Sequence, residues 1–153
     1  MLVRLAQLNP TVGDIQGNTS RILKEIESAR EQGIELLILP ELAICGYPPM
    51  DLLNLPKFRE TLYKANNTII DQSPGITLIF GSISPNEQAG RPCHNSAFVV
   101  SNRKLLGIQH KSLLPNYDVF DDMRYFEPAI LVEPIELFGI KWGISVCEDI
   151  WQN

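Results

Sequence analysis

The pattern of apolar and polar positions predicts a strand, a helix and a second strand near the start of the chain. Residues 2–8 alternate between apolar and polar side chains, as a strand does. Apolar residues then recur at helical spacing, with Asn18 or Thr19 as the expected N-cap and Gly33 as the expected stop. Residues 34–39 are almost wholly apolar, which is typical of a strand covered on both faces. This succession predicts a βαβ unit with two parallel strands.

A second helix and three further strands are expected in the middle of the chain. Apolar residues recur at helical spacing over residues 56–70, and Pro56 stands near the start, where proline is favoured. Strands are predicted at residues 76–80, 96–100 and 104–109. The last two are expected to form a hairpin through the turn Ser-Asn-Arg.

The last third of the chain combines a long irregular segment with a predicted hairpin. Residues 115–128 are polar and aromatic without a clear period, and loops of this length inside a domain are typically functional. Residues 130–138 and 140–146 predict a hairpin that turns at Gly139 and ends on Cys147. Because no helix follows to cover this hairpin, we expect the chain to stop in the middle of a domain.

Composition and charge narrow the class of protein. With 44% hydrophobic and 20% charged residues, the 153-residue chain is typical of a soluble α/β protein. The net charge of -5, without a basic cluster, argues against nucleic acid, and neither a signal peptide nor a membrane span is expected. Unpaired cysteines favour the reduced cytoplasm, with Cys45 and Cys93 as structural residues. His94 and His110 fit no zinc spacing, so no metal site is predicted.

Three residues with catalytic chemistry follow predicted strands. Glu41, Lys111 and Cys147 each stand at a strand end, where sites are built in α/β folds. A cysteine hydrolase needs a thiol nucleophile, a base and a donor for the oxyanion, and these three residues suffice. Taken singly, they are better explained as a strand cap, an exposed lysine and a buried thiol. Their joint arrangement favours catalysis.

The residues around these three positions resemble a known family. Leu-Pro-Glu41, His-Lys111 and Val-Cys147-Glu-Asp are similar to the Glu–Lys–Cys triad of the nitrilase superfamily of carbon-nitrogen hydrolases. More narrowly, residues 116–126 and the motif ending at Trp151 resemble the glutaminase domains of glutamine-dependent NAD synthetases. The resemblance covers the whole chain but only about half of such a domain, and it implies truncation just after the nucleophile.

The resemblance implies a fold and a reaction. The fold would be α/β, about half of a four-layer αββα sandwich. Cys147 would attack the side-chain amide of L-glutamine and form a thioester, Glu41 would act as base, and Lys111 would hold the oxyanion. The glutaminase step would need no cofactor. Ammonia would pass to a synthetase domain that uses ATP and magnesium and is absent from these residues, and the complete protein is expected to be a homo-oligomer.

The resemblance also implies substrate-binding residues. Tyr117 and Glu148 match positions that contact the α-amino end of glutamine, and Trp151 is a candidate wall of the pocket. Asp122 stands where the family usually has glutamate, and Glu127 is a second candidate for an acid near the triad. Two alternatives stay open: another nitrilase-type amidase or carbamoyl hydrolase, and an inactive fragment with a structural or interaction role. The chain alone is expected to be weak or inactive, because apolar sheet surface would be exposed.

Overall fold

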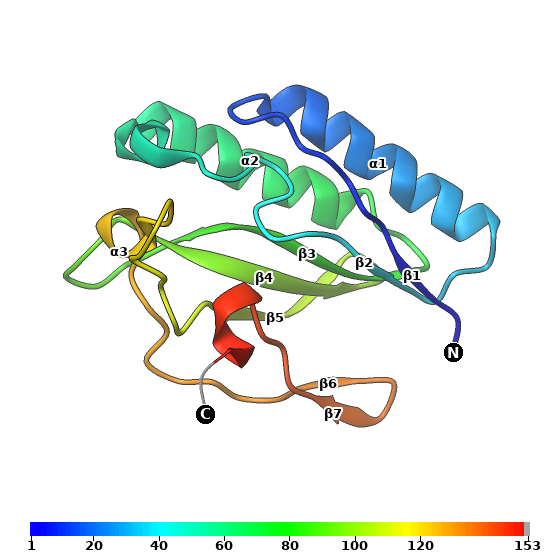
Figure 1. Cartoon of the computed structure of the whole chain (residues 1–153). Helices are drawn as coiled ribbons and strands as arrows, with labels where there is room; N and C mark the ends of the chain where they lie inside the picture. The colour runs from blue at the N-terminus through cyan, green and yellow to red at the C-terminus, as the bar shows by residue number, and fades with distance from the viewer. Residues whose placement is uncertain (152–153) are drawn as a thin grey trace.

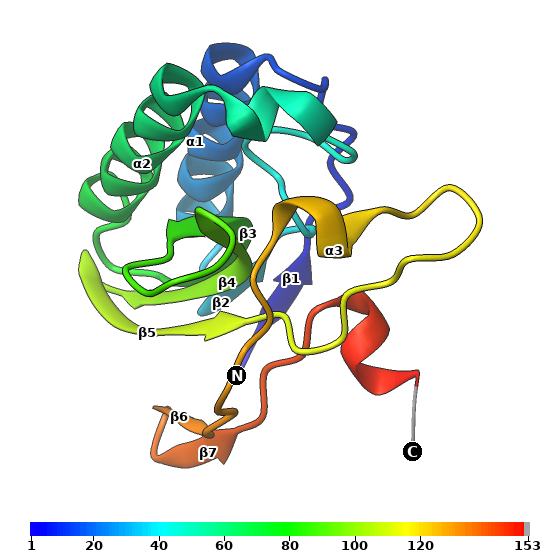
Figure 2. The same ribbon diagram turned by 90° about the vertical axis from the view of Figure 1, so that its left-hand side faces the viewer.

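Two long helices lie side by side on one face of a five-stranded sheet, and a small hairpin lies on the other face (Figures 1 and 2). This computed structural model describes residues 1–151. The helical elements are α1 (Ile15–Glu31), α2 (Pro56–Asp71), α3 (Asp122–Tyr125) and the 3-10 turns η1 (Met50–Asn54) and η2 (Cys147–Ile150). The strands are β1 (Val3–Leu5), β2 (Leu36–Ile38), β3 (Thr77–Pro85), β4 (Cys93–Ser101), β5 (Lys104–His110), β6 (Ile135–Leu137) and β7 (Ile140–Trp142). The expected α/β class is confirmed, with one layer of helices and one large sheet.

The large sheet joins a parallel half to an antiparallel half. Its order is β1-β2-β3-β4-β5, with β1, β2 and β3 parallel and β4 and β5 antiparallel to their neighbours. Helix α1 connects β1 to β2, and α2 connects β2 to β3, so the predicted βαβ unit is confirmed and is followed by a second one. The hairpin of β4 and β5 is also confirmed, and its turn residues Asn102 and Arg103 have φ values of 48° and 66°.

Helix α1 begins earlier than the sequence predicted. Its N-cap is Asp14, whose carboxylate accepts a hydrogen bond from a backbone N–H of the first turn. Asn18 lies inside the helix and is buried, and its side-chain amide donates to the backbone oxygens of Thr11 and Ile44. The prediction of Asn18 or Thr19 as the cap was therefore wrong, because Asn18 fastens two loops to the helix instead.

The larger hydrophobic core lies between the helices and the sheet. Ile22 and Ile26 of α1 and Leu62 and Ile69 of α2 are fully buried against the strands, as their helical spacing predicts. Burying an apolar side chain of this size contributes roughly 1.5–3 kcal/mol. This layer therefore holds in place the strands whose ends carry the candidate catalytic residues.

A smaller apolar cluster lies on the opposite face of the sheet. Its buried members are Leu36, Ile79, Ala97, Val99, Leu137 and Val146. The first four belong to strands of the sheet, and the other two come from β6 and from the segment that precedes η2. The cluster consequently holds the cysteine-bearing segment against the sheet.

The hairpin expected from residues 130–138 and 140–146 is much shorter in the structure. β6 and β7 have three residues each. Pro134 precedes β6 and lacks a backbone donor, and Gly143 follows β7 and is a poor strand residue. Cys147 accordingly begins η2 and does not stand at a strand end, so that prediction was wrong.

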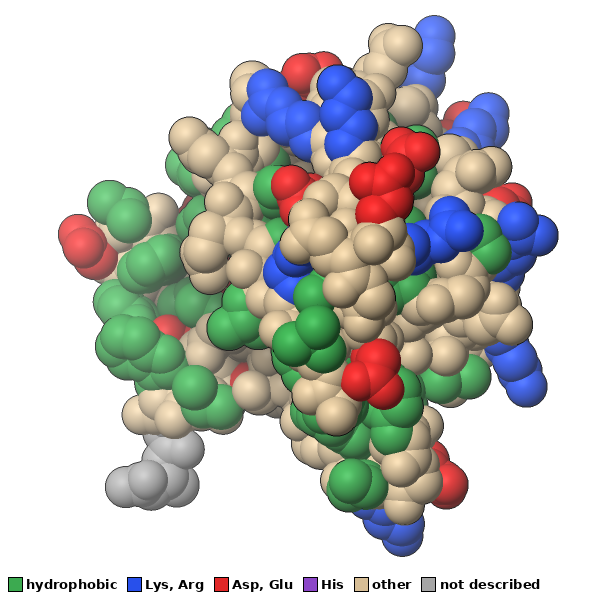
Figure 3. Space-filling model, turned by 90° about the vertical axis from the view of Figure 1, so that its right-hand side faces the viewer, with side chains coloured by type: hydrophobic (Ala, Val, Ile, Leu, Met, Phe, Trp, Pro, Cys, Tyr) green, Lys and Arg blue, Asp and Glu red, His purple; other side chains and the backbone are tan. Residues whose placement is uncertain are grey.

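Apolar side chains are exposed at the sheet edge and before β6, as expected from the sequence. Leu5 of β1 and the neighbours Ile130 and Leu131 are among them, and Ile130 is 88% exposed. Figure 3 shows hydrophobic side chains gathered on the lower and left parts of one face, whereas Lys and Arg side chains lie mainly on its upper and right parts. None of the helices in residues 1–151 is long and apolar enough to cross a membrane.

Candidate active site

Glu41 lies in a tight turn that follows β2. Leu42, the next residue, has a φ of 46°, in the left-handed region that few non-glycine residues adopt. The turn is hydrogen-bonded to Gly81 of β3, because Ala43 N–H donates to Gly81 O at 2.8 Å and Gly81 N–H donates to Pro40 O at 3.1 Å. These bonds fix the backbone from which the Glu41 carboxylate projects.

Lys111 directly follows β5, and its side chain is only 1% exposed. Its Nζ donates to Glu41 Oε1 at 2.9 Å and to Asp122 Oδ2 at 2.8 Å. Burial alone would lower the pKa of Lys111, but the hydrogen bonds and charges of the two carboxylates raise it above its ordinary value. An ammonium group has three N–H donors, so one remains for a substrate oxygen.

The two candidate acids occupy different positions. Asp122 begins α3 and accepts hydrogen bonds from Lys111 and, at 2.9 Å, from the hydroxyl of Tyr47. Burial and the negative charge of Asp122 raise the pKa of Tyr47, so its hydroxyl keeps the proton that it donates. Glu127 instead accepts from the backbone N–H of Arg91 at 2.8 Å. The geometry therefore places Asp122 beside Lys111 and Glu127 elsewhere.

Cys147 is presented by a strained backbone at the start of η2. Its φ of 49° lies in the left-handed region, and such outliers concentrate at functional sites. The residue is exposed. Together with Glu41, Gly81 and Ala97 it lines a cleft of about 120 Å³. The thiol and the carboxylate therefore face the same small space.

The surroundings of Cys147 favour the protonated thiol. Partial burial raises its pKa, and the negative charge of Glu41 raises it further, while Lys111 and the backbone N–H of Glu148 act in the opposite direction. The resulting pKa lies above the ordinary value of a thiol. Because the thiolate is the reactive form, attack by Cys147 requires a base, and Glu41 is placed to act as one.

Asp149 ties the cysteine-bearing turn to the segment that follows Lys111. Its Oδ1 accepts from the backbone N–H groups of Ser112 and Leu113 at 2.8 Å and 2.9 Å, and its Oδ2 accepts from Val146 N–H at 2.9 Å. Hydrogen bonds to a carboxylate are stronger than neutral ones. One side chain thus holds the nucleophile and the lysine segment in a fixed relation.

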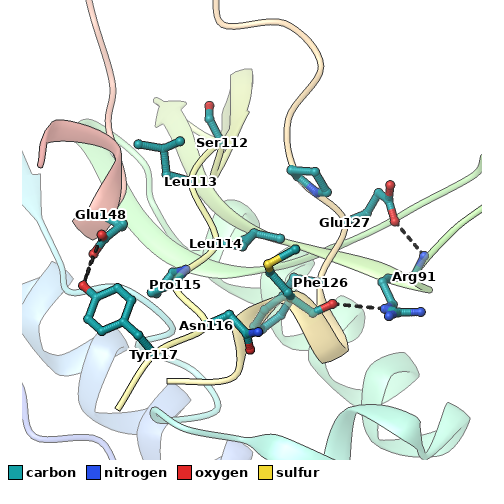
Figure 4. A pocket seen from close by; sticks show the side chains of 12 residues that line it. Arg91, Ser112, Leu113, Leu114, Pro115, Asn116, Tyr117, Phe126, Glu127 and Glu148 are labelled. Atoms are coloured by element: carbon teal, nitrogen blue, oxygen red, sulfur yellow. Dashed lines mark hydrogen bonds between the residues drawn. The ribbon is translucent and has the colours of Figure 1, made fainter. Parts of the chain in front are cut away.

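A larger cavity of about 530 Å³ adjoins this turn. On one wall the hydroxyl of Tyr117 lies 3.1 Å and 3.0 Å from the two carboxylate oxygens of Glu148, and this hydrogen bond is the main cause that raises the pKa of Tyr117. Arg91 and Glu127 lie on the opposite wall (Figure 4). Glu148 is 7% exposed, and a buried carboxylate calls for a cation. The wall formed by Tyr117 and Glu148 is therefore suited to an ammonium group.

The predicted site residues thus separate into three groups. The first comprises Glu41 and Cys147, which line the small cleft, together with Lys111, which donates to Glu41, and Asp122, which accepts from Lys111. The second lines the larger cavity: Tyr117, Glu127 and Glu148. Trp151 lines neither the small cleft nor the larger cavity and is 74% exposed, so the structure does not place it in the candidate site.

Two neighbours of the triad are not identified by the sequence patterns. Asn95 of β4 donates from Nδ2 to Glu41 Oε1 at 2.6 Å, and Tyr47 donates to Asp122. Tyr47 lies in a loop rich in glycine and proline, where nothing marks it. Nothing in the pattern of β4 singles out Asn95, because His94, Ser96 and Ser101 of the same strand are also polar and Ser96 is also buried.

Comparison with known protein sequences identifies one family over nearly the whole chain. The family model described as carbon-nitrogen hydrolase matches residues 2–153. The chain is 40% identical to a glutamine-dependent NAD(+) synthetase from Synechocystis sp., over 99% of this chain and 28% of that protein. It is 41% identical to the protein of the same name from Thermotoga maritima, over 97% and 26%. The chain thus spans less than a third of the length of these relatives.

Solved structures give the same result. A glutamine-dependent NAD+ synthetase from Acinetobacter baumannii, in complex with ADP, superposes with a TM-score of 0.89 at 38% identity, over 97% of this chain and 28% of that one. An amidase from Nesterenkonia sp. has a TM-score of 0.80 at 24% identity, over 95% and 54%, and shares the fold. The family model and the two relatives show that the chain belongs to the carbon-nitrogen hydrolase family.

Proposed function

We propose that this chain carries a glutaminase site that hydrolyses the side-chain amide of L-glutamine through a thioester on Cys147. The carrying observation is that Lys111 is buried between Glu41 and Asp122, beside the cleft that Glu41 and Cys147 line together. The names of the relatives, which are glutamine-dependent NAD(+) synthetases, support glutamine as the substrate.

The first half-reaction forms the thioester. The sulfur of Cys147 bonds to the amide carbon while Glu41 takes the thiol proton. Negative charge develops on the amide oxygen, where the third N–H of Lys111 and the backbone N–H of Glu148 serve as donors. The C–N bond breaks as Glu41 returns its proton to the nitrogen, which leaves as ammonia.

The second half-reaction restores the enzyme. Glu41 removes a proton from a water molecule, whose oxygen attacks the thioester carbon. The C–S bond breaks, glutamate leaves, and the proton returns to the sulfur of Cys147. Lys111 accompanies Glu41 through both steps, because its Nζ stays within hydrogen-bond distance of the carboxylate.

The wall of Tyr117 and Glu148 is proposed to bind the α-ammonium of glutamine. Removing the charge in Glu148→Gln is expected to raise KM for glutamine about 10- to 100-fold, because a hydrogen bond to a charged group contributes roughly 1.5–3 kcal/mol. Hydrolysis of glutaramate, which is glutamine without its α-amino group, should be unchanged. Ammonia release by the full-length gene product measures both.

Glu127→Gln is the matched control for that substitution. Glu127 lies on the opposite wall of the same cavity, so its replacement should leave the preference for glutamine over glutaramate intact. If Glu148→Gln slowed both substrates equally, Glu148 would not be the ammonium site. If the unsubstituted protein cleaved glutaramate as fast as glutamine, the alternative of another amidase or carbamoyl hydrolase would gain support.

Gly81 is expected to be required for the position of Glu41. A Cβ added at Gly81 would lie 2.5 Å from Glu41 Cα and 2.5 Å from Pro40 O, so the turn would have to move. Gly81→Ala should lower kcat about 100-fold, as a displacement of about 1 Å can do. Gly143→Ala, in the segment before Cys147, provides the control, because apart from its chain neighbours no residue in 1–151 lies within 4 Å of its added Cβ. Equal activity of both variants would show that the turn tolerates displacement.

The wider role proposed here extends beyond the described residues. Ammonia from this site would serve ATP-dependent NAD synthesis on a separate synthetase domain, with magnesium acting there. Residues 1–153 would form the N-terminal part of a carbon-nitrogen hydrolase domain, in a homo-oligomeric cytoplasmic protein. The superposition on 54% of the amidase chain and 28% of the NAD+ synthetase chain supports this division. The remaining alternative is a chain with only a structural role, which would release no ammonia in the same assay.

A further inference from the structure

Asn95 is a buried polar residue at the centre of the candidate site. It lies on β4 and is 0% exposed. Its Nδ2 donates to Glu41 Oε1 at 2.6 Å, and its backbone oxygen accepts from Lys111 N–H at 2.8 Å. Its Oδ1 has no hydrogen-bond partner among residues 1–151. One residue is therefore bonded to both the base and the lysine of the triad.

The hydrogen bonds distinguish the two oxygens of Glu41. Oε1 accepts from Asn95 Nδ2 and from Lys111 Nζ, which occupies both of its lone pairs. Within the described part of the chain, Oε2 accepts no hydrogen bond from an N–H group. The small cleft shared with Cys147 opens beside this carboxylate. The free oxygen is therefore the one available to a thiol or to a water molecule.

We propose that Asn95 is a positioning residue that holds Glu41 Oε1 against Lys111 and thereby directs Oε2 toward the thiol of Cys147. Lys111 alone cannot do this, because a single hydrogen bond leaves a carboxylate free to rotate about its last torsion. Two donors, the Asn95 amide on β4 and the Lys111 ammonium just after β5, fix both the plane and the direction of the carboxylate. Asn95 touches neither the substrate nor the reacting sulfur.

The hydrogen bond to Glu41 distinguishes Asn95 from Asn66, a buried asparagine whose Oδ1 is also unpartnered among residues 1–151 but whose amide donates only to the backbone oxygen of Ile83. A buried acceptor without a partner is unfavourable, so an apolar residue of the same volume would suit the position of Asn95 at least as well for stability. The hydrogen bond to Glu41 is what the amide adds. A group that is costly to stability and useful to a reaction is typical of an active site.

Asn95→Leu removes the donor and keeps the volume. If Asn95 positions the base, kcat for glutamine should fall about 100-fold, as expected for a misplaced catalytic group, while KM stays within about threefold. Asn95→Asp serves as a second variant of the same shape that cannot donate when ionised, and kcat should fall at least as far. Both are measured as ammonia release by the full-length gene product.

Asn66→Leu is the matched control. Asn66 is also buried, also donates from Nδ2, here to the backbone oxygen of Ile83, and also has an unpartnered Oδ1, but it does not contact the triad. Its replacement should leave kcat within about threefold of the original value. An equal loss of kcat in Asn66→Leu and Asn95→Leu would overturn the proposal, as would an unchanged kcat in Asn95→Leu.

The ammonia assay rests on the proposed function. A second readout, the pH dependence of Cys147 alkylation, does not depend on turnover. Glu41 raises the pKa of Cys147 by its charge and by a hydrogen bond. When Glu41 is loosened by Asn95→Leu, the pH midpoint of Cys147 alkylation by iodoacetamide should move down, toward the ordinary thiol value. Cys45 and Cys93 are buried, so they would be alkylated only if the protein unfolded. Their alkylation should be the same in the variant and in the unsubstituted protein.

The two readouts separate the possible failures. If the unsubstituted protein released no ammonia from glutamine but the alkylation midpoint still moved down in Asn95→Leu alone, the proposed function would fail and the positioning role would stand. If the midpoint stayed constant in Asn95→Leu, or moved equally in Asn66→Leu, the positioning role would be wrong even in an active glutaminase. Alkylation of all three cysteines at the same rate would mark an unfolded variant, and Asn95→Asp would then decide.

Discussion

Replacing Cys147 with serine is expected to lower glutamine turnover by about 10⁴-fold or more, because the variant loses the nucleophile around which the other groups are arranged. Serine preserves the size of the side chain, and Cys147 is exposed. The free energy of unfolding should therefore change by less than about 0.5 kcal/mol. Ammonia release and thermal unfolding of the full-length gene product test both expectations together.

Labelling with an electrophilic glutamine analogue provides the control for this substitution. Cys147 should be modified, and glutamine should protect it. Burial raises the pKa of Cys45 to about 12 and that of Cys93 to about 11, so these thiols should stay unmodified in the folded protein. Equal labelling of all three cysteines, without protection by glutamine, would contradict the presence of a formed site.

Lys111→Met is expected to affect both catalysis and folding. The loss of one oxyanion donor should lower kcat about 10²- to 10³-fold. Removing the buried ammonium leaves Glu41 and Asp122 facing each other without a counter-charge, which should cost about 3 kcal/mol or more of stability. Enzyme kinetics and denaturant unfolding measure the two effects separately.

Two further variants separate these effects. Adding Asp122→Asn to Lys111→Met removes the uncompensated charge that is 4% exposed, so part of the stability should return while kcat stays low. Lys104→Met removes an exposed lysine at the other end of β5 and should change neither quantity. A Lys111→Met protein with full activity would exclude the lysine from oxyanion binding.

The contribution of Lys111 to the free energy of unfolding depends on pH, and the direction in which its pKa is shifted determines how. Its pKa in the folded protein is raised above the ordinary value, so the lysine stabilises the fold fully below its unfolded pKa of about 10.4. This contribution is lost only as the pH rises through the higher, folded-state pKa. The difference in unfolding free energy between Lys111→Met and the unsubstituted protein should therefore be constant from neutral pH to about 10 and smaller above it.

The periodicity of the sequence predicts the helices and most strands of the sheet because these elements depend on local spacing. Residues 56–70 have helical spacing and form α2 with nearly the same limits. The predicted hairpin around Gly139 is present, but its second strand ends at Trp142 and does not reach Cys147, because a run of apolar residues does not reveal how far two strands pair. The helix α3 spans a single turn, which is too short to produce a visible period.

The sequence by itself determined the order of the fold elements and identified Glu41, Lys111 and Cys147 as candidate catalytic residues, since both depend on local patterns and motifs. Only the tertiary structure decided which groups surround that chemistry. It placed Asp122 rather than Glu127 on Lys111, joined Asn95 to Glu41, and left Trp151 outside both cavities. The physical reason is that these contacts join residues far apart in the chain. Such residues come within hydrogen-bond distance only when the strands, turns and loops pack together.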